Sequence, residues 1–175
     1  MMKNNMVLVG FMGTGKSTVG KELAHRLGKV HVDLDQAIVE HEKSDIPTIF
    51  LEKGEAYFRD VESRLLEELL QKENIVLTTG GGAVLRPNNV TIMMLHSIVI
   101  TLTAAQEEII KRVSQDTNRP LLAGDVRERV ASLMEARKGL YDFAPVQVDT
   151  TDRSVENIVE EIIKKTIEER DFRRD

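Results

Sequence analysis

Residues 10–17 read Gly-Phe-Met-Gly-Thr-Gly-Lys-Ser, which is the G-x-x-x-x-G-K-S pattern of a phosphate-binding P-loop. The apolar run 6–9 in front of it is typical of a buried strand, and Val19, Leu23 and Leu27 recur behind it at helical spacing. A P-loop needs this strand–loop–helix order, because its backbone N–H groups and the positive end of the helix dipole face the same anion. The motif therefore predicts an α/β fold in which Lys16 reaches the terminal phosphates and the Ser17 hydroxyl binds Mg²⁺.

Two alternatives exist for this stretch. A chance match in a glycine-rich turn would account for the G-x-x-x-x-G-K-S motif, but not for the strand and the helix predicted on either side of it. The dinucleotide-binding fingerprint G-x-G-x-x-G, counted from Gly13, would need glycine where Thr18 stands, so that pattern fails.

Composition limits the classes of protein that this chain can belong to. Its 175 residues suit a single domain with a sizeable core, and 41% hydrophobic and 30% charged residues are ordinary for a globular protein. The net charge of −5 argues against general nucleic-acid affinity, and no apolar run approaches the roughly 18 residues of a membrane span. Because the chain has no cysteine and shows no secretory signal, we expect a cytoplasmic protein without disulfides and without nucleic-acid or membrane partners.

Two carboxylates follow the second predicted strand, 30–32. Asp33 and Asp35 are separated by one residue, so in an extended chain both side chains point to the same side. Ligands of open α/β sheets bind at the carboxyl ends of the strands, which makes the pair a candidate for the same crevice as the P-loop. The alternative is that one aspartate caps the next helix.

A turn of three glycines, Gly80 to Gly82, follows the third predicted strand, 75–78. It could bring N–H donors close to a substrate, or it could simply reverse the chain. Further strands are expected at 97–102 and 146–150, with helices between all the strands. This alternation predicts a parallel five-stranded sheet with helices on both faces.

Arg59 is a candidate functional residue in a helix predicted over about 55–72. It lies on the flank of the apolar stripe of that helix rather than opposite it. Glu55 and Glu62 stand at i−4 and i+3, so an ordinary ion pair on the helix surface is the structural alternative.

Two more arginines are candidates in the second half of the chain. Arg137 falls on the buried face of a helix predicted over 125–141, where a charge is costly unless it is paired. An internal ion pair, or a side chain that snorkels outward, is the alternative. Arg119 lies in the polar stretch 115–120, which suits either a phosphate-covering lid or an ordinary exposed loop.

In this order and spacing, the pieces resemble the shikimate kinase family along nearly the whole chain. The matching pieces are segment 10–20, Asp33-Leu-Asp35, Gly54-Glu55-x-x-Phe58-Arg59-x-x-Glu62, Gly80-Gly81-Gly82, Arg119-Pro120-Leu121-Leu122 and Arg137-x-x-Leu140-Tyr141. The resemblance implies a P-loop NTPase-like three-layer α/β/α sandwich of the nucleoside-monophosphate-kinase type. It implies one kinase domain over 1–175, with substrate-binding helices over about 33–62 and a lid over about 112–124.

The resemblance also implies the reaction and the residues that perform it. ATP would phosphorylate the 3-hydroxyl of shikimate on the way to chorismate and the aromatic amino acids, with Mg²⁺ as the metal. Apart from the resemblance, we expect a monomer. The implied catalytic residues are Lys16, Asp35 and Arg119, and the implied metal site is Ser17 with Asp33. The implied ATP contacts are Gly13, Thr14, Gly15, Lys16, Ser17, Thr18, Arg112, Arg119 and Arg153. The implied shikimate contacts are Asp35, Arg59, Gly80, Gly81, Gly82 and Arg137.

Two departures from the family pattern affect the part that would hold the nucleotide base. The loop 150–155 lacks the proline that members often place against adenine, although Arg112 stands seven residues before Arg119, as the family's adenine-stacking arginine does. The segment 141–144 is slightly shorter than usual.

Other functions of this fold remain as rivals. A kinase acting on gluconate or on a nucleotide is the nearest one, and a nucleotide-binding module without phosphoryl transfer is the rival from another class. The chain has no Asn-Lys-x-Asp motif for reading guanine, which argues against a GTPase switch.

Overall fold

The structure is a computed structural model that describes residues 4–114 and 125–172. Helices and strands alternate along the chain as the sequence predicts. In order, the elements are β1 (Asn5–Val9), α1 (Lys16–Leu27), β2 (Val30–Asp33), α2 (Leu34–Glu42), α3 (Ile46–Leu70), β3 (Ile75–Thr78), the 3₁₀ helix η1 (Ala83–Leu85), α4 (Pro87–His96), β4 (Ser97–Thr103), α5 (Gln106–Ser114), α6 (Val126–Ala136), β5 (Val146–Asp149) and α7 (Val155–Phe172).

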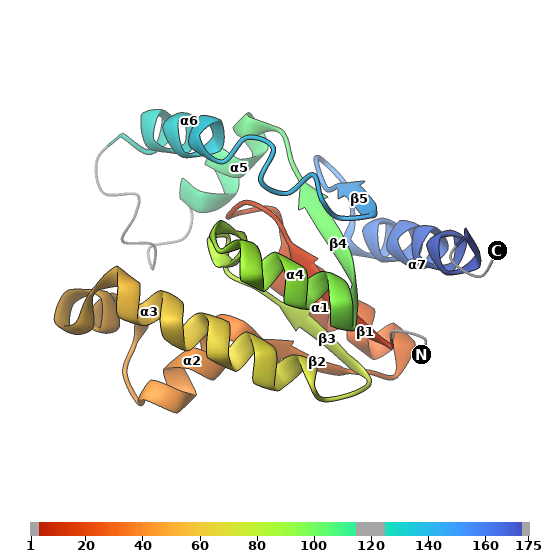
Figure 1. Cartoon of the computed structure of the whole chain (residues 1–175). Coiled ribbons are helices and arrows are strands. Elements are labelled where there is room, and N and C mark those ends of the chain that lie inside the picture. Colours follow the sequence, from red (N-terminus) through yellow and green to blue (C-terminus); the bar gives the residue numbers. More distant parts are fainter. Residues whose placement is uncertain (1–3, 115–124, 173–175) are drawn as a thin grey trace.

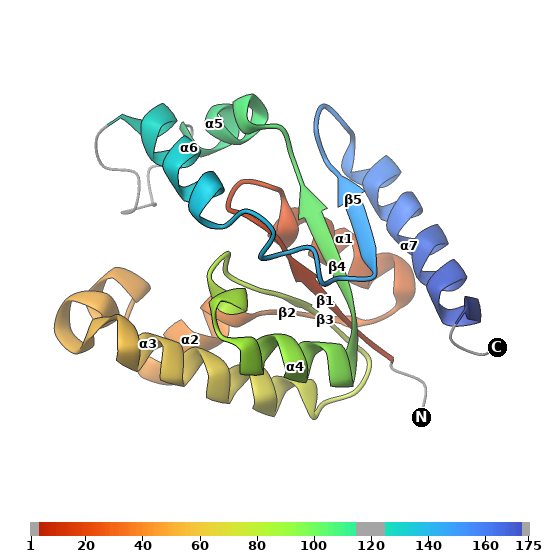
Figure 2. The ribbon, with the colours of Figure 1, turned by 45° about the horizontal axis from the view of Figure 1, so that its top comes forward.

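The strands form one parallel five-stranded sheet in the order β2-β3-β1-β4-β5 (Figures 1 and 2), which confirms the predicted architecture. The central strand is β1, where Val7 pairs with Leu77 of β3 on one side and with Val99 of β4 on the other. Because the P-loop leaves the carboxyl end of this central strand, strand ends lie on both sides of it and can supply side chains to one site.

The central strand divides the core into two layers. Val7 and Val9 face a cluster that contains residues of α2, α3 and α4, whereas Met6 and Leu8 face a cluster with α1 and α7 (Figure 2). This alternation is the two-residue period of a strand buried on both faces. Each such side chain contributes about 1.5–3 kcal/mol by leaving water, so the two layers together hold the P-loop strand in place.

A third, smaller cluster lies beyond the sheet. Phe11 and Met12 of the P-loop pack against Ile109 and Val113 of α5 and Val130 of α6. The apolar side chains inside the glycine-rich motif therefore anchor α5 and α6 next to the loop (Figure 1).

A kink interrupts α3 at Gly54, directly before the helix predicted over about 55–72. Gly54 has φ 82° and ψ 168°, a backbone conformation that only glycine adopts readily. Asp45 caps the helix by accepting a hydrogen bond from the backbone N–H of Thr48 at 2.8 Å. The kink divides the helix just before the segment that carries Arg59.

The helix predicted over 125–141 was too long. It ends at Ala136, and Arg137 occupies the C-cap position with φ −107° and ψ 10°. The chain then continues in tight turns, in which the N–H of Leu140 bonds the carbonyl of Arg137 at 3.1 Å. Arg137 therefore lies at the C-terminal end of α6 and not on the buried face of a helix.

Part of the predicted lid, 112–124, lies outside the described residues, and so does Arg119. Among the residues that the structure does describe, no helix combines the length and the apolar character that crossing a membrane requires.

Candidate active site

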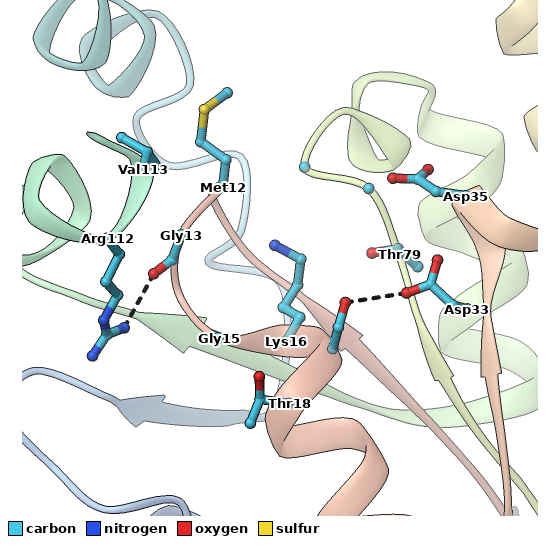
Figure 3. A pocket seen from close by; sticks show the side chains of 13 residues that line it. Met12, Gly13, Gly15, Lys16, Thr18, Asp33, Asp35, Thr79, Arg112 and Val113 are labelled. Atoms are coloured by element: carbon cyan, nitrogen blue, oxygen red, sulfur yellow. Dashed lines mark hydrogen bonds between the residues drawn. The ribbon is translucent and has the colours of Figure 1, made fainter. Parts of the chain in front are cut away.

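A cavity of about 280 Å³ opens where the P-loop meets the ends of β2 and β3 (Figure 3). Its lining residues come from the loop, the aspartate pair, the glycine turn and α5; they are Met12, Gly13, Gly15, Lys16, Ser17, Thr18, Asp33, Asp35, Thr79, Gly80, Gly81, Arg112 and Val113. The structure thus brings the predicted phosphate-binding residues and both aspartates to one place. The alternative in which the P-loop letters arise by chance does not account for this convergence.

The P-loop has the backbone geometry that anion binding requires. Gly15 caps α1 in the left-handed conformation, with φ 92° and ψ 16°, so the first N–H groups of the helix face the cavity. The ammonium of Lys16 donates to the carbonyls of Gly10 and Phe11, both at 2.8 Å, and only 8% of the residue is exposed. Figure 3 shows the side chain rising into the space between the loop and Asp35.

Asp33 combines the two roles that the sequence left as alternatives. Its Oδ1 accepts from the backbone N–H of Gln36 at 3.1 Å, which caps α2. Its Oδ2 accepts from the hydroxyls of Ser17 at 3.1 Å and Thr78 at 2.8 Å. Three donors from three elements therefore fix the orientation of the carboxylate at the start of α1.

The Ser17–Asp33 pair fits Mg²⁺ by its chemistry. A hydroxyl and a carboxylate are hard oxygen donors, and magnesium is usually held by one or two such groups together with phosphates of the substrate. No cluster of three or more His, Cys, Asp or Glu that could hold a metal occurs among the described residues. Ser17 and Asp33 would supply the protein ligands of a magnesium site, and phosphate oxygens would complete it.

Each glycine of the turn after β3 faces a different predicted substrate residue. A Cβ placed on Gly80 would lie 2.8 Å from Oδ1 of Asp35, and one on Gly81 would lie 3.1 Å from Nη1 of Arg137. A Cβ on Gly82 would lie 2.8 Å from Nη1 of Arg59. A side chain at any of these three positions would therefore displace the carboxylate or guanidinium group beside it.

Arg59 makes the ion pair that was its structural alternative, but the pair is not on the surface. Its Nη1 lies 2.7 Å from Oε2 of Glu62, whose side chain is 1% exposed, while the Arg59 side chain is 14% exposed. Burial raises the pKa of the Glu62 carboxyl, and the charge of Arg59 opposes that shift. The Nε of Arg59 is buried without a hydrogen-bond partner and lies 3.5 Å from Oε1 of Glu55.

Arg137 stands against Gly81 on the side of the turn that faces α6. Its guanidinium carbon lies 5.8 Å from the centre of the Phe11 ring, within the range of a cation–π contact. It lines a second, largely apolar cavity of about 210 Å³ together with Phe11 and Tyr141. Arg59, Gly82 and Arg137 are not among the residues that line the larger cavity; they adjoin it through the glycine turn.

The two arginines predicted to contact ATP have different surroundings. Arg112 lines the main cavity and donates to the carbonyl of Gly13 at 3.1 Å and to the carbonyl of Thr150 at 2.8 Å. It therefore joins the P-loop to the loop after β5. Arg153 pairs with Glu161 at 2.6 Å and is not among the residues that line the cavity.

Sequence reasoning missed several residues that shape this site. Thr78 holds Asp33, and the hydroxyl of Thr150 donates to the carbonyl of Thr14 at 3.0 Å. The Tyr141 hydroxyl donates to the carbonyl of Gly81 at 2.7 Å. Tyr141 was noted only as the end of the motif that begins at Arg137, and neither threonine belongs to a motif that would have marked it.

Comparison with known proteins identifies the family. The shikimate kinase family model matches residues 12–167. The shikimate kinase of Geobacter metallireducens is 45% identical over 159 residues, which cover 90% of this chain and 89% of that protein. The shikimate kinase of Pelotomaculum thermopropionicum is 44% identical over 160 residues, with 91% and 93% of the two chains covered.

Solved structures agree with these relatives. The shikimate kinase of Acinetobacter baumannii in complex with shikimate superimposes with a TM-score of 0.90 at 33% identity, over 95% of this chain and 94% of that one. A gluconokinase from Sinorhizobium meliloti has a TM-score of 0.66 at 16% identity, over 97% and 94% of the two chains, and shares the fold alone. The P-loop, the aspartate pair and the glycine turn with its flanking arginines thus occur in a chain that belongs to the shikimate kinase family.

Proposed function

We propose that this chain transfers the terminal phosphoryl group of ATP to the 3-hydroxyl of shikimate, and that the residues around the glycine turn select the acceptor. The observation that supports this most directly is the convergence of Asp35, Arg59 and Arg137 on three consecutive glycines beside a P-loop. The three residues come from separate parts of the chain, and the fold brings them together next to the turn, which supports an acceptor site there.

The acceptor site matches the chemistry of shikimate, a ring that carries a carboxylate and neighbouring hydroxyls. Arg59 and Arg137 would bind the carboxylate, because a guanidinium presents a planar fork of donors to its two oxygens. The buried Nε of Arg59, which lacks a hydrogen-bond acceptor, is one donor that such a carboxylate could satisfy. Asp35 would accept hydrogen bonds from the ring hydroxyls and orient the one that attacks.

The phosphate end would be held by the P-loop. Lys16 would exchange its bonds to the carbonyls of Gly10 and Phe11 for phosphate oxygens, while the N–H groups of Gly13 to Thr18 surround the anion. Ser17 and Asp33 would hold Mg²⁺, which neutralises phosphate charge when bound. Arg112 would lie along the nucleotide, and Arg119 and Arg153 remain proposed ATP contacts.

Phosphoryl transfer needs mainly positioning and charge neutralisation, so these contacts account for the chemistry without a covalent intermediate. A segment that covers the phosphates would keep water from competing with the 3-hydroxyl, and we assign that role to 112–124 with Arg119.

A panel assay coupled to ADP release tests the proposal against its rivals. Purified protein with MgATP is offered shikimate, gluconate and a nucleoside monophosphate separately, with Lys16→Ala as the inactive control. We expect turnover with shikimate alone and none from the control. Transfer to gluconate but not to shikimate would overturn the assignment, and ATP binding without transfer to any acceptor would indicate a nucleotide-binding module.

We also propose that the active species is a monomer, because the residues of the proposed acceptor site and the P-loop come from one chain. The location that we propose is the cytoplasm, as suits a chain without cysteine. Size-exclusion chromatography with light scattering at assay concentration should give the 19.7 kDa of the single chain. A stable dimer would refute this part while leaving the reaction intact.

A further inference from the structure

Tyr141 is held at two points in the segment between α6 and β5. Its hydroxyl donates to the carbonyl of Gly81 at 2.7 Å. Its own carbonyl accepts from the hydroxyl of Thr101 on β4 at 2.7 Å. Tyr141 therefore connects the sheet to the glycine turn, although Tyr141 and Gly81 are 60 residues apart in the sequence.

The carbonyl that Tyr141 binds belongs to the middle glycine of the turn. A Cβ on Gly81 would lie 3.1 Å from Nη1 of Arg137 and 3.4 Å from the backbone nitrogen of Met12. Gly81 is thus the point where the turn, the P-loop and Arg137 meet. A small shift of its peptide would change the gap between Arg137 and the turn, where the shikimate carboxylate would lie.

The surroundings of the phenol favour a fixed donor. The ring packs against the core layer of α2, α3 and α4 and also against the Phe11 cluster. Burial raises the pKa of the Tyr141 phenol, and the charge of Arg137 and its hydrogen bond oppose this shift without cancelling it. The hydroxyl therefore keeps its proton at neutral pH and can donate to Gly81.

We propose that Tyr141 is a positioning residue for shikimate: its hydroxyl fixes the Gly81 carbonyl and thereby sets the distance between the glycine turn and Arg137. This inference rests on the proposed function and adds a residue to the acceptor site. Tyr141 touches neither the phosphates nor the reacting hydroxyl in this scheme, so its effect should be confined to the acceptor.

Tyr141→Phe tests this role because it removes the hydroxyl and keeps the ring. We expect the KM for shikimate to rise about fivefold or more, the size of one lost hydrogen bond, while the KM for ATP changes less than about twofold. Shikimate-induced thermal stabilisation should fall, and ADP-induced stabilisation should persist. The latter shows that the variant is folded.

The other tyrosine of the chain supplies the matched control. Tyr57 is 37% exposed and donates to Glu42 of α2 at 3.0 Å, away from the cavity. Tyr57→Phe should leave both KM values unchanged. If Tyr141→Phe behaves like Tyr57→Phe, or raises both KM values together, the positioning role is wrong. If the wild-type chain does not phosphorylate shikimate, it is the proposed function that fails.

Discussion

Arg137 lies at the end of α6 with its guanidinium beside Gly81 and above the Phe11 ring. Its neighbour Lys138 has a side chain that is 77% exposed and lies 3.6 Å from Glu135. Lys138 is thus more exposed than Arg137 and contacts neither Gly81 nor Phe11 in the described contacts, so replacing it controls for the removal of a positive side chain.

We expect Arg137→Ala to raise the KM for shikimate by roughly 10- to 100-fold, because hydrogen bonds to charged groups contribute about 1.5–3 kcal/mol. The affinity for ATP should remain nearly intact. Steady-state kinetics with each substrate varied in turn measures both, and Lys138→Ala should match the wild type. An equal loss for both substrates would mean that Arg137 is structural.

Glu62 predicts a pH dependence of stability. Burial raises its pKa above the ordinary 4.5. A carboxyl whose pKa is higher in the folded than in the unfolded state stabilises the fold below its unfolded pKa, and this stability is lost as pH rises through the folded pKa. Relative to Glu62→Gln, the wild type should therefore lose free energy of unfolding as pH rises above about 4.5, and then reach a plateau.

Denaturant unfolding of both proteins across a pH series measures this difference. Glu67→Gln, on the exposed part of the same helix, controls for the removal of one carboxylate. A difference between the wild type and Glu62→Gln that stays constant across the series would contradict the inference.

At the scale of elements, α3 and the glycine turn would form the acceptor side of the proposed site. The kink at Gly54 sets the direction of the segment that carries Arg59, and Arg59 then meets Gly82. A Cβ on Gly54 would meet nothing within 4 Å, so the constraint at this position is backbone conformation rather than space. Substitution should thus act through the angle of the kink.

Gly54→Ala should destabilise the protein by about 1–3 kcal/mol, the cost of forcing a side chain into this backbone region, and should raise the KM for shikimate if the kink relaxes to avoid that cost. The exposed Ala56→Gly is the matched control, since it weakens the same helix by about 1 kcal/mol without changing the kink. Thermal unfolding measures the loss of stability in each variant, and steady-state kinetics measures the KM for shikimate. A higher KM in Gly54→Ala alone would then come from the changed kink and not from lower stability. Equal shikimate KM values in both variants would show that the kink does not position Arg59.

Local patterns in the sequence predicted the strands and the P-loop, because each depends on residues that are neighbours in the chain. The end of α6 was misjudged, since apolar spacing continued past Ala136 although the backbone turned there. The burial of Glu62 and the bond from Tyr141 to Gly81 depend on how distant segments pack, and no spacing rule encodes that. The convergence of Asp35, Arg59 and Arg137 was predicted from the resemblance to the shikimate kinase family. The local sequence around each residue did not predict it.

At the scale of the whole molecule, the site lies between two groups of helices. One group, α2 and α3, carries Asp35 and Arg59, and the other, α5 and α6, carries Arg112 and ends at Arg137 (Figure 1). The P-loop strand lies between them in the sheet. A ligand that contacts both groups at once would hold them together, so binding should stabilise the whole fold.

We expect MgADP at 100 times its Kd to stabilise the protein by about 2.7 kcal/mol, as linkage requires for a ligand that binds only the folded state. Differential scanning fluorimetry should show an increase in Tm, and removing Mg²⁺ with EDTA should reduce that increase. Lys16→Ala should lose most of the shift. An unchanged shift in Lys16→Ala would place the nucleotide away from the P-loop.

The glycine turn limits how this protein can evolve. Since Gly80, Gly81 and Gly82 each adjoin a different functional group, even a single methyl at any of them would disturb a different interaction. A lineage that adopted an acceptor without a carboxylate would no longer need the two arginines in place, and the glycines at 81 and 82 would then be free to vary. Sequence drift at these two positions would accordingly mark a change of acceptor before any change in the P-loop did.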